Sequence, residues 1–446
     1  MEKNTEINVN IENYGCNGEG VAKINGEVVF LPYTIAGENI DATIIKANKK
    51  FSIGKIKKIN LPSENRITPP CPYYSKCGGC VFQHMIYENS LAVKTEIVQN
   101  AISHIGKIDY TVPTVIKSPN EYHYRNKIAL PVNPKTRRLG MFRLSSHNIV
   151  DIDDCLLQKD LVSKLIKIFN EYLQKSQCSI YDEATGKGIL KHFVAREINK
   201  NLLVTVVING DDLQDKNTLI EILSKNFDNV GISLNINKLN NNVILTDKFV
   251  DIFGENYAII EEYGIKYQIN NQSFLQVNDD VKKMMYQKIF EEIENETVID
   301  AYSGAGLLSA MISKHAKEVF GIEIVKEATI LADNLKKLNN ISNLVNINGD
   351  CSIELPKLIS KLSDEQIKNL SVVLDPPRKG CDKKVIDAIL EVLPNKIIYM
   401  SCDPSTLSRD LNLLLSTKDY NIKYIQPYDM FPQTKHIETI AVLIKK

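Results

Sequence analysis

TVIDAYSGAGLLSAMISKHAKEVFGIEI, residues 297–324, is typical of a strand, a glycine-containing turn, a helix and a second strand. TVIDAY is rich in β-branched and apolar residues, whereas GLLSAMISKHA has the spacing of a helix that buries one face. The pattern continues with expected strands at 344–350, 370–377, 396–402, 422–430 and 437–444, and expected helices at 280–293, 326–339 and 382–393. This alternation predicts a doubly wound parallel α/β sheet over 270–446. The last two strands should pair antiparallel, because only a short turn joins them.

The whole chain has 446 residues, which is enough for about three domains with separate cores. It carries 54 Lys and Arg residues against 54 Asp and Glu residues, so its formal net charge is zero. Any surface that binds a polyanion must therefore come from local clustering and not from bulk charge. No apolar run is long enough for a membrane span, and MEKNTEINVNIE at the start lacks the apolar stretch of a secretion signal. We therefore expect a cytoplasmic protein.

Residues 1–60 predict a small all-β barrel of five strands. EINVNIENY, GVAKI and EVVFLPY are short strand-like runs, and glycine-containing breaks separate them. The second part of this region, 41–60, holds six lysines against one acid. These lysines form either a solvated strand face or an edge that contacts RNA. LPSENRITPP (61–70) follows as a proline-punctuated linker.

The region between linker and α/β sheet predicts helices over 88–106 and 161–174, with mixed β structure through 110–265. Within it, 117–147 carries seven Lys and Arg residues but a single acid, Glu121, and aromatic residues lie between the charges. Single-stranded RNA is bound by cations for its phosphates and rings for its unstacked bases. A half-exposed strand with inward-packed tyrosines would give the same pattern, so both interpretations stay open.

Acidic residues end the first three strands of the α/β region. Gly304 and Gly306 lie in the first turn, but the third glycine of a dinucleotide fingerprint is missing. Glu323 ends the second strand, where a carboxylate can accept both ribose hydroxyls of an adenosyl ligand. Asp300 and Asp350 end the first and third strands. S-adenosylmethionine (SAM) has no pyrophosphate and needs no three-glycine cradle, so the pattern favours SAM over NAD.

Two motifs follow the fourth and fifth strands. In LDPPRKG (374–380), Arg378 stands where amino-methylating enzymes usually carry an aromatic residue, which argues against N-methylation. In YMSCDPSTLSRD (399–410), Cys402 ends its strand at the expected ligand cleft, and a helix should start at Ser405. A helix N-terminus stabilises a thiolate, so Cys402 is either a nucleophile or a buried structural cysteine. In HIETIAVLI, His436 and Glu438 share one strand face, and Glu438 is either a base or a surface charge.

Four further cysteines have the spacing of metal ligands: Cys71, Cys77, Cys80 and Cys155. Their C-x5-C-x2-C pattern with one remote cysteine suits a four-thiolate zinc site about as well as an iron–sulfur cluster. Radical-SAM enzymes use a C-x3-C-x2-C triad, so the five-residue first gap argues against that class.

Together these motifs resemble the RNA (uracil-5-)-methyltransferases, in particular the iron–sulfur-containing 23S rRNA (uracil-5-)-methyltransferases with an N-terminal TRAM domain. The resemblance covers nearly the whole chain. It rests on the N-terminal barrel, CPYYSKCGGC with Cys155, FLQVN (274–278), DAYSGAG, GIE, DPPRKG, SCDPSTLSRD and the terminal H-I-E.

The resemblance implies an α/β fold: a doubly wound, Rossmann-like SAM-dependent methyltransferase domain with an OB-like TRAM barrel and a mixed α+β central domain. The expected domains are 1–60 for TRAM, 70–90 with 118–268 for the central domain, and 91–117 with 269–446 for catalysis. The implied SAM-binding residues are Gln276, Tyr302, Glu323, Asp350 and Asp375. The implied nucleophile is Cys402, the implied base is Glu438, and the implied [4Fe-4S] ligands are Cys71, Cys77, Cys80 and Cys155.

The implied reaction is methyl transfer from SAM to carbon 5 of a specific uridine in 23S ribosomal RNA. Cys402 would form a covalent adduct with carbon 6, and the product would be 5-methyluridine. We expect a monomer that binds RNA and no membrane. Two alternatives stay open: an RNA cytosine-5-methyltransferase, and a non-catalytic iron–sulfur RNA-binding protein.

Overall fold

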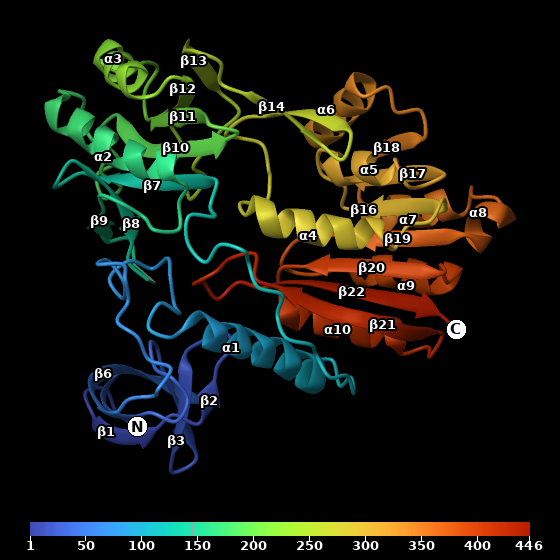
Figure 1. The fold of residues 1–446 in the computed structure, drawn as a ribbon, viewed down its shortest axis with the longest axis horizontal. Coiled ribbons are helices and arrows are strands. Elements are labelled where there is room, and N and C mark those ends of the chain that lie inside the picture. The colour runs from blue at the N-terminus through green and yellow to red at the C-terminus, as the bar shows by residue number, and fades with distance from the viewer. Residues whose placement is uncertain (145) are drawn as a thin grey trace.

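The structure is a computed structural model that describes residues 1–144 and 146–446, and three sheets follow one another along its chain (Figure 1). The N-terminal and central sheets lie beside each other, and the C-terminal sheet with its helices forms the other half of the molecule (Figure 1). Among the described residues, no helix is long and apolar enough to cross a membrane.

The N-terminal sheet has the strand order β1-β5-β6-β4-β3-β2. Its strands are β1 (Glu6–Asn10), β2 (Asn13–Tyr14), β3 (Gly20–Ile24), β4 (Glu27–Leu31), β5 (Asn39–Ala47) and β6 (Phe51–Leu61). Alternate residues of these strands point inward, so that Val29, Leu31, Ile40 and Ile44 form one apolar core. The all-β prediction is confirmed, but the sheet has six strands instead of five, because the short β2 also pairs with β3.

The central sheet has the order β13-β12-β11-β10-β7-β8-β9. Its strands are β7 (Lys127–Asn133), β8 (Arg138–Phe142), β9 (Ile149–Asp151), β10 (Leu190–Ile198), β11 (Asn201–Ile208), β12 (Val230–Ile236) and β13 (Phe249–Phe253). The predicted helix is α2 (Asp160–Lys175), and a second helix, α3 (Lys216–Asn226), was not expected. Only Leu219 and Leu223 of α3 are buried, and so narrow an apolar stripe gives little helical signal. A hairpin of β14 (Ala258–Glu262) and β15 (Ile265–Ile269) follows.

The C-terminal sheet has the order β18-β17-β16-β19-β20-β22-β21. Its strands are β16 (Thr297–Ala301), β17 (Glu318–Glu323), β18 (Leu344–Asn348), β19 (Leu370–Leu374), β20 (Lys396–Ser401), β21 (Tyr420–Tyr428) and β22 (Glu438–Lys445). The first five are parallel, and β22 inserts antiparallel between β20 and β21. The predicted strands and the antiparallel final pair are confirmed.

Helices cover both faces of this sheet. They are α4 (Asp279–Phe290), α5 (Leu307–Ile312), α6 (Lys326–Leu338), α7 (Cys351–Ile359), α8 (Asp364–Lys368), α9 (Lys383–Val392) and α10 (Pro404–Leu415). Val373 packs in the core that contains α4 and α5, whereas Val372 packs in the core that contains α7, α9 and α10. Both faces of the parallel strands are therefore apolar, as a doubly wound sheet requires. Helix α7 was not expected from the sequence, because Pro356 inside it hides the helical pattern.

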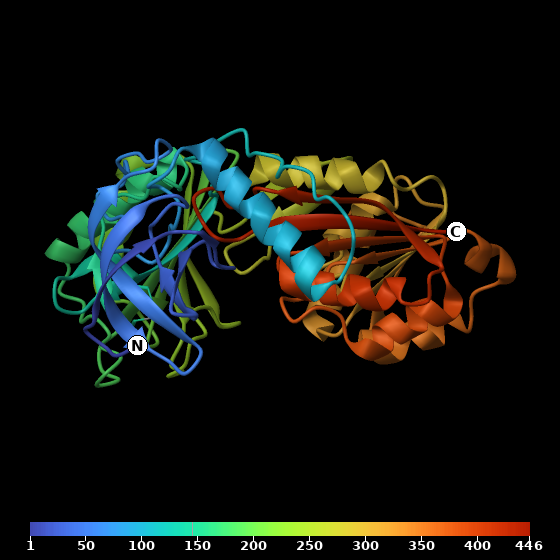
Figure 2. The ribbon, with the colours of Figure 1, turned by 90° about the horizontal axis from the view of Figure 1, so that it is seen from below.

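The helix predicted at 88–106 is α1 (Tyr87–Asn100), and a π-helical turn, η1 (Ala101–Ile105), continues it. Although α1 precedes the central sheet in the chain, Val93, Ile97 and Ile102 pack in the core of the C-terminal sheet. In Figure 2, α1 runs from the N-terminal sheet along the C-terminal one. It therefore spans the place where the two parts meet.

Candidate active site

Cys402 lies between the end of β20 and the start of α10, and it lines a cleft of about 380 Å³. The walls come from the turn 14–17 of the N-terminal sheet, from 97–105 of α1 and η1, and from Arg378, 402–405 and 435–437 of the C-terminal sheet edge. The thiol is half-buried. The cleft thus brings together three parts of the chain that are far apart in sequence.

The environment of Cys402 favours the thiol over the thiolate. Burial raises its pKa to about 11, the carboxyl groups of Glu438 and Asp375 contribute to that rise, and Arg378 opposes it. The prediction that the N-terminus of the following helix stabilises the Cys402 thiolate is therefore wrong. Asp403 caps α10 and accepts hydrogen bonds from the backbone N–H groups of its first turn, so its own carboxylate occupies these donors.

Glu438 is the first residue of β22 and is only 4% exposed. The interpretation as a surface charge is therefore wrong. The antiparallel ladder of β20 and β22 ends with Ser401 paired to Thr439, and Cys402 and Glu438 are the next residues beyond that pair on the two strands. Burial raises the pKa of Glu438 to about 8, Asp375 adds to this rise and Arg378 opposes it. The thiol and a carboxyl group poised to exchange a proton near neutral pH thus meet at one end of the sheet.

Two more carboxyl groups, the buried Asp300 and the half-buried Asp375, lie along the same edge. Burial raises the pKa of Asp375 to about 7, and the neighbouring Asp300 contributes. Burial likewise raises the pKa of Asp300 to about 7, although Ser309 donates a hydrogen bond to its carboxylate. Like-charged groups this close oppose one another's ionisation. The carboxyl ends of β16 and β19 and the start of the antiparallel β22 therefore carry acids that hold protons at near-neutral pH.

Arg378 is a site residue that the sequence interpretation used only as evidence against N-methylation. Its charge lowers the pKa of both Cys402 and Glu438, so it faces the centre of the site. A buried carboxylate, Asp410 on α10, accepts hydrogen bonds from the Cys381 N–H and the Tyr399 hydroxyl, and Arg409 donates to the Lys379 carbonyl. These contacts fix the turn that carries Arg378. They explain why the SCDPSTLSRD motif ends in Arg-Asp.

His436 and Lys435 also line the cleft. Burial and nearby cations, including Arg378, lower the pKa of His436 to about 4, so its ring is neutral at pH 7. Lys435 donates a hydrogen bond of 2.7 Å to the Asn17 side chain of the N-terminal domain. That domain is therefore tied directly to the active-site edge.

A second set of residues forms a hydrogen-bonded turn at the ends of β16 and β17. Glu323 Oε2 accepts a hydrogen bond of 2.9 Å from Gly304 N, and its Oε1 accepts one of 2.8 Å from Val325 N. These bonds hold the carboxylate at the end of β17 and leave a second lone pair on each oxygen for a diol. A Cβ built on Gly304 would meet no atom within 4 Å, so a ligand has room to approach the backbone. The turn suits the ribose of an adenosyl group.

Of the other predicted SAM residues, Tyr302 and Asp350 follow β16 and β18, and Gln276 precedes α4. Tyr302 has a left-handed backbone conformation (φ 71°) and is half-buried beside Cys381. Asp350 follows β18, is exposed and caps α7 by accepting a hydrogen bond of 2.8 Å from Ser352 N. Gln276 is buried just before α4. Asn278, two residues further along the same segment, caps α4, because its side chain accepts a hydrogen bond from Val281 N.

The four predicted metal ligands, Cys71, Cys77, Cys80 and Cys155, are free and none is fully exposed. They lie close together, since the charges of other cysteines of the set raise the pKa of Cys80 and of Cys155. Within residues 1–144 and 146–446, however, no group of three or more His, Cys, Asp or Glu side chains is arranged to hold a metal ion. The structure therefore brings the cysteines together and does not confirm a metal site.

Comparisons with known proteins agree with this architecture. The family model described as tRNA (uracil-5-)-methyltransferase matches residues 86–446, and the TRAM domain model matches 2–57. An uncharacterized RNA methyltransferase of Clostridium tetani is 38% identical over 99% of this chain and 97% of its own. One of Clostridium acetobutylicum is 38% identical over 100% and 98%. The crystal structure of Pyrococcus abyssi tRNA (uracil-54, C5)-methyltransferase with S-adenosyl-L-homocysteine covers 98% of this chain and 100% of its own, at a TM-score of 0.78 and 24% identity. That likeness confirms the predicted fold.

Proposed function

Because the chain belongs to the tRNA (uracil-5-)-methyltransferase family, whose members are SAM-dependent RNA methyltransferases, we propose that it methylates carbon 5 of a uridine through a covalent enzyme–RNA adduct. The observation that carries this proposal is that Cys402 lines the cleft while the buried Glu438 lies close enough for its charge to raise the Cys402 pKa, just past the Ser401–Thr439 pair that ends the β20–β22 ladder. A nucleophile and a base on opposite sides of one pyrimidine ring are what the reaction needs.

The chemistry divides between these two side chains. Carbon 5 of uracil is too weak a nucleophile to take a methyl group directly. Cys402 gives its proton to water and bonds to carbon 6, which moves the electron pair of the 5,6-double bond towards carbon 5 and the 4-carbonyl. Carbon 5 then takes the methyl group and releases S-adenosylhomocysteine. Glu438 removes the carbon-5 proton, the double bond re-forms, and the carbon–sulfur bond breaks.

Asp375 and Arg378 are placed to hold the uracil during these steps. With a pKa raised to about 7, Asp375 keeps a proton part of the time and can donate a hydrogen bond to a uracil carbonyl as well as accept one from N3–H. The positive charge of Arg378 stabilises the Cys402 thiolate, and it also stabilises the enolate that forms when the thiolate adds to the uracil. Both residues belong to the DPPRKG turn.

The methyl donor belongs at the Gly304–Glu323 turn, with Gln276, Tyr302 and Asp350 around it. Glu323→Gln should raise the KM for SAM by roughly 10- to 100-fold, because an amide N–H₂ would face N–H donors of the turn and leave one ribose hydroxyl unbound. Initial rates at varied SAM concentration measure the effect. Glu318→Gln, at the other end of β17, is the matched control and should leave the KM unchanged. Equal KM values for both variants would remove Glu323 from the SAM site.

The RNA class is proposed as 23S ribosomal RNA, with the target uridine unstacked so that it can reach Cys402. Three features support RNA binding: the TRAM domain, the basic and aromatic segment 117–147, and a cleft wall supplied by the N-terminal domain. We further propose that residues 1–60 and the central domain bind RNA while 91–117 and 269–446 catalyse.

Mass spectrometry of ribosomal and transfer RNA from a deletion strain tests both target and chemistry. A 5-methyluridine should disappear from 23S RNA and return with the gene. Loss from transfer RNA alone would overturn the ribosomal assignment, and loss of a 5-methylcytidine would show a cytosine enzyme. With unchanged RNA of both kinds, the non-catalytic alternative would hold.

We also propose that Cys71, Cys77, Cys80 and Cys155 hold a [4Fe-4S] cluster. Four thiols from two separate segments, gathered in one neighbourhood and free of disulfides, are a donor set that suits such a group. Bound there, the cluster would cross-link the 71–80 loop to the start of α2. The chemistry of methyl transfer needs none of these thiols, because Cys402 supplies the nucleophile.

Protein purified without oxygen should contain about four irons per chain and absorb in the visible charge-transfer region. Iron and zinc analysis with absorption spectra measures this, and Cys155→Ser should lose both iron and colour. Cys178→Ser, a buried cysteine of the same domain, serves as control. Stoichiometric zinc without iron would overturn the cluster in favour of a zinc site.

A further inference from the structure

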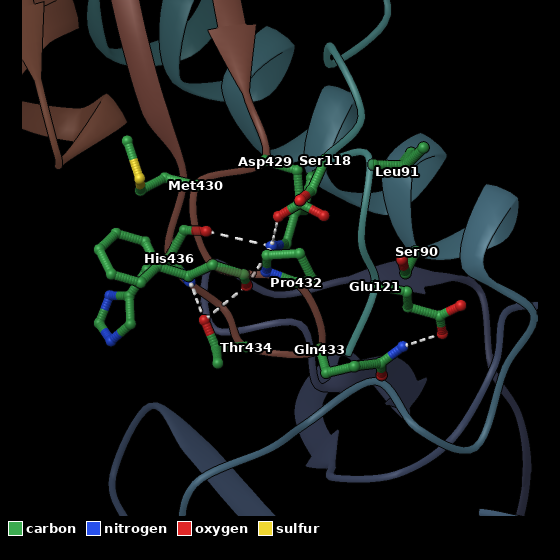
Figure 3. A network of polar contacts seen from close by, with 12 residues as sticks. Ser90, Leu91, Ser118, Glu121, Asp429, Met430, Pro432, Gln433, Thr434 and His436 are labelled. Atoms are coloured by element: carbon green, nitrogen blue, oxygen red, sulfur yellow. Dashed lines mark hydrogen bonds and ion pairs between the residues drawn. The ribbon is translucent and has the colours of Figure 1, made fainter. Parts of the chain in front are cut away.

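The loop between β21 and β22, residues 429–437, carries the side chains that approach Cys402 from the C-terminal strand. His436 and Lys435 line the cleft, and the chain continues directly into Glu438. Most of the loop is buried, which leaves its backbone groups dependent on protein partners. Thr434 supplies some of these partners from within the loop, by donating to the Phe431 carbonyl and accepting from His436 N, and Figure 3 shows α1 and the segment around Glu121 beside the loop.

One buried ammonium joins the two ends of this loop. Lys94 of α1 is fully buried, and its Nζ donates hydrogen bonds to Asp429 Oδ1 (2.5 Å), the Phe431 carbonyl (3.0 Å) and the His436 carbonyl (3.1 Å). All three N–H donors of the ammonium are thereby used. Asp429 and His436 bracket the loop, so a single side chain fixes both the exit from β21 and the approach to Glu438.

The Lys94–Asp429 ion pair belongs to a larger network. Tyr87, also on α1, donates a hydrogen bond of 2.8 Å to Asp429 Oδ2, and its hydroxyl accepts one of 3.1 Å from Ser118 N. Neither side chain of the ion pair is exposed to solvent. A pair buried in this way has a defined geometry, and loss of one member leaves the other as an uncompensated charge that must move towards water.

The tip of the loop has separate anchors. The Gln433 carbonyl accepts hydrogen bonds from Val81 N (2.8 Å) and Phe82 N (3.3 Å), and its side chain donates to Glu121 (Figure 3). Tyr124 donates a hydrogen bond of 3.0 Å to the Pro432 carbonyl. These contacts hold the tip if Lys94 is removed, so the change should remain local to the loop ends.

We propose that Lys94 is a positioning residue for the proton-removal step. It fixes the His436 carbonyl two residues before Glu438 and thereby sets where the Glu438 carboxylate meets the carbon-5 proton. The inference rests on the proposed function, since it assigns Lys94 to a step of that reaction. Cys402 lies between β20 and α10, whereas the hydrogen bonds of Lys94 go to Asp429, Phe431 and His436, so formation of the adduct should depend on Lys94 far less than breakdown does.

Lys94→Met tests this division. Breakdown of the enzyme–RNA adduct should slow by about 100-fold, the effect of a misplacement of about 1 Å at a reacting group. An SDS-stable adduct with ordinary uridine RNA should then accumulate, while RNA affinity changes little. Lys191→Met is the matched control, because Lys191 is also a buried lysine that donates to two loop carbonyls, Asn237 and Leu239, but in the central domain. The Lys191→Met enzyme should methylate RNA at the parent rate and should accumulate no adduct.

Three further variants keep the test decisive. Tyr87→Phe removes only the hydroxyl bonded to Asp429, and a smaller accumulation of adduct is expected; it replaces Lys94→Met if that variant does not fold. Lys94→Arg keeps the charge and should restore part of the turnover. Glu438→Gln is the reference for a blocked breakdown. If Glu438→Gln accumulates adduct and the Lys94 and Tyr87 variants do not, the positioning role is wrong and the proposed function stands. If Glu438→Gln itself forms none, the proposed mechanism fails first.

Discussion

Methyl transfer is expected to stop when Cys402 is replaced by alanine, with a loss of at least about 10⁴-fold in kcat. Without the thiolate, carbon 5 never becomes enolate-like, and neither the bound donor nor Glu438 can compensate. The fold should be unaffected, because the side chain is half-buried at a cleft and is not part of an apolar core. Binding of SAM and RNA should stay within about threefold of the parent.

Transfer of labelled methyl groups to RNA measures this loss, with calorimetry for SAM and filter binding for RNA. Cys178→Ala, a buried cysteine of the central domain, controls for the loss of a thiol and should keep its activity. An active Cys402→Ala enzyme would exclude covalent catalysis at this residue. Lost RNA binding in the same variant would indicate a damaged cleft instead.

Glu438→Gln is expected to stop turnover at a later stage and to trap the enzyme on its RNA. The amide has the size of the carboxyl group but cannot take a proton, so Cys402 still adds and the methyl group still transfers. The expected loss in kcat is roughly 10²- to 10⁴-fold, the usual contribution of a general base. Because Glu438 is buried with a pKa raised to about 8, its neutral replacement should cost little stability.

A denaturing gel reveals the trapped complex as a protein band that carries labelled RNA and one labelled methyl group. Glu296→Gln is the matched control: Glu296 is likewise buried, but at the opposite end of the same sheet, where it accepts a hydrogen bond from Ser371. It should form no lasting adduct. Adduct without a transferred methyl group would place Glu438 before methyl transfer and contradict its role as the final base.

The double variant Cys402→Ala/Glu438→Gln links the two results. It should form no adduct and should bind RNA as the Cys402→Ala enzyme does. Adduct in the double variant would show that another nucleophile attacks the base. Cys16, exposed in the same cleft, would then be the first residue to examine.

Local sequence patterns were enough to predict the α/β domain. Parallel strands buried on both faces need continuous apolar runs, and the helices between them need a periodic stripe, so every strand from β16 to β22 could be located from its composition. The ends of these strands also carried the chemistry: Glu323, Asp375 and Cys402 each follow or close a strand. Where the signal was weak or interrupted, as in α3 and around Pro356 of α7, the elements were missed.

What the sequence by itself determined, then, is which residues end the strands, because hydrophobic periodicity is a property of neighbouring residues. Tertiary structure alone decided that β22 inserts beside β20 and brings Glu438 near Cys402, since strand order depends on packing between distant segments. It also decided the charge states. Burial and nearby carboxyl groups raise the pKa of Cys402, and the cap by Asp403 cancels the helix effect that the local motif predicts. The desolvation of a titratable group depends on all the residues that surround it in space, and the local sequence pattern does not specify those residues.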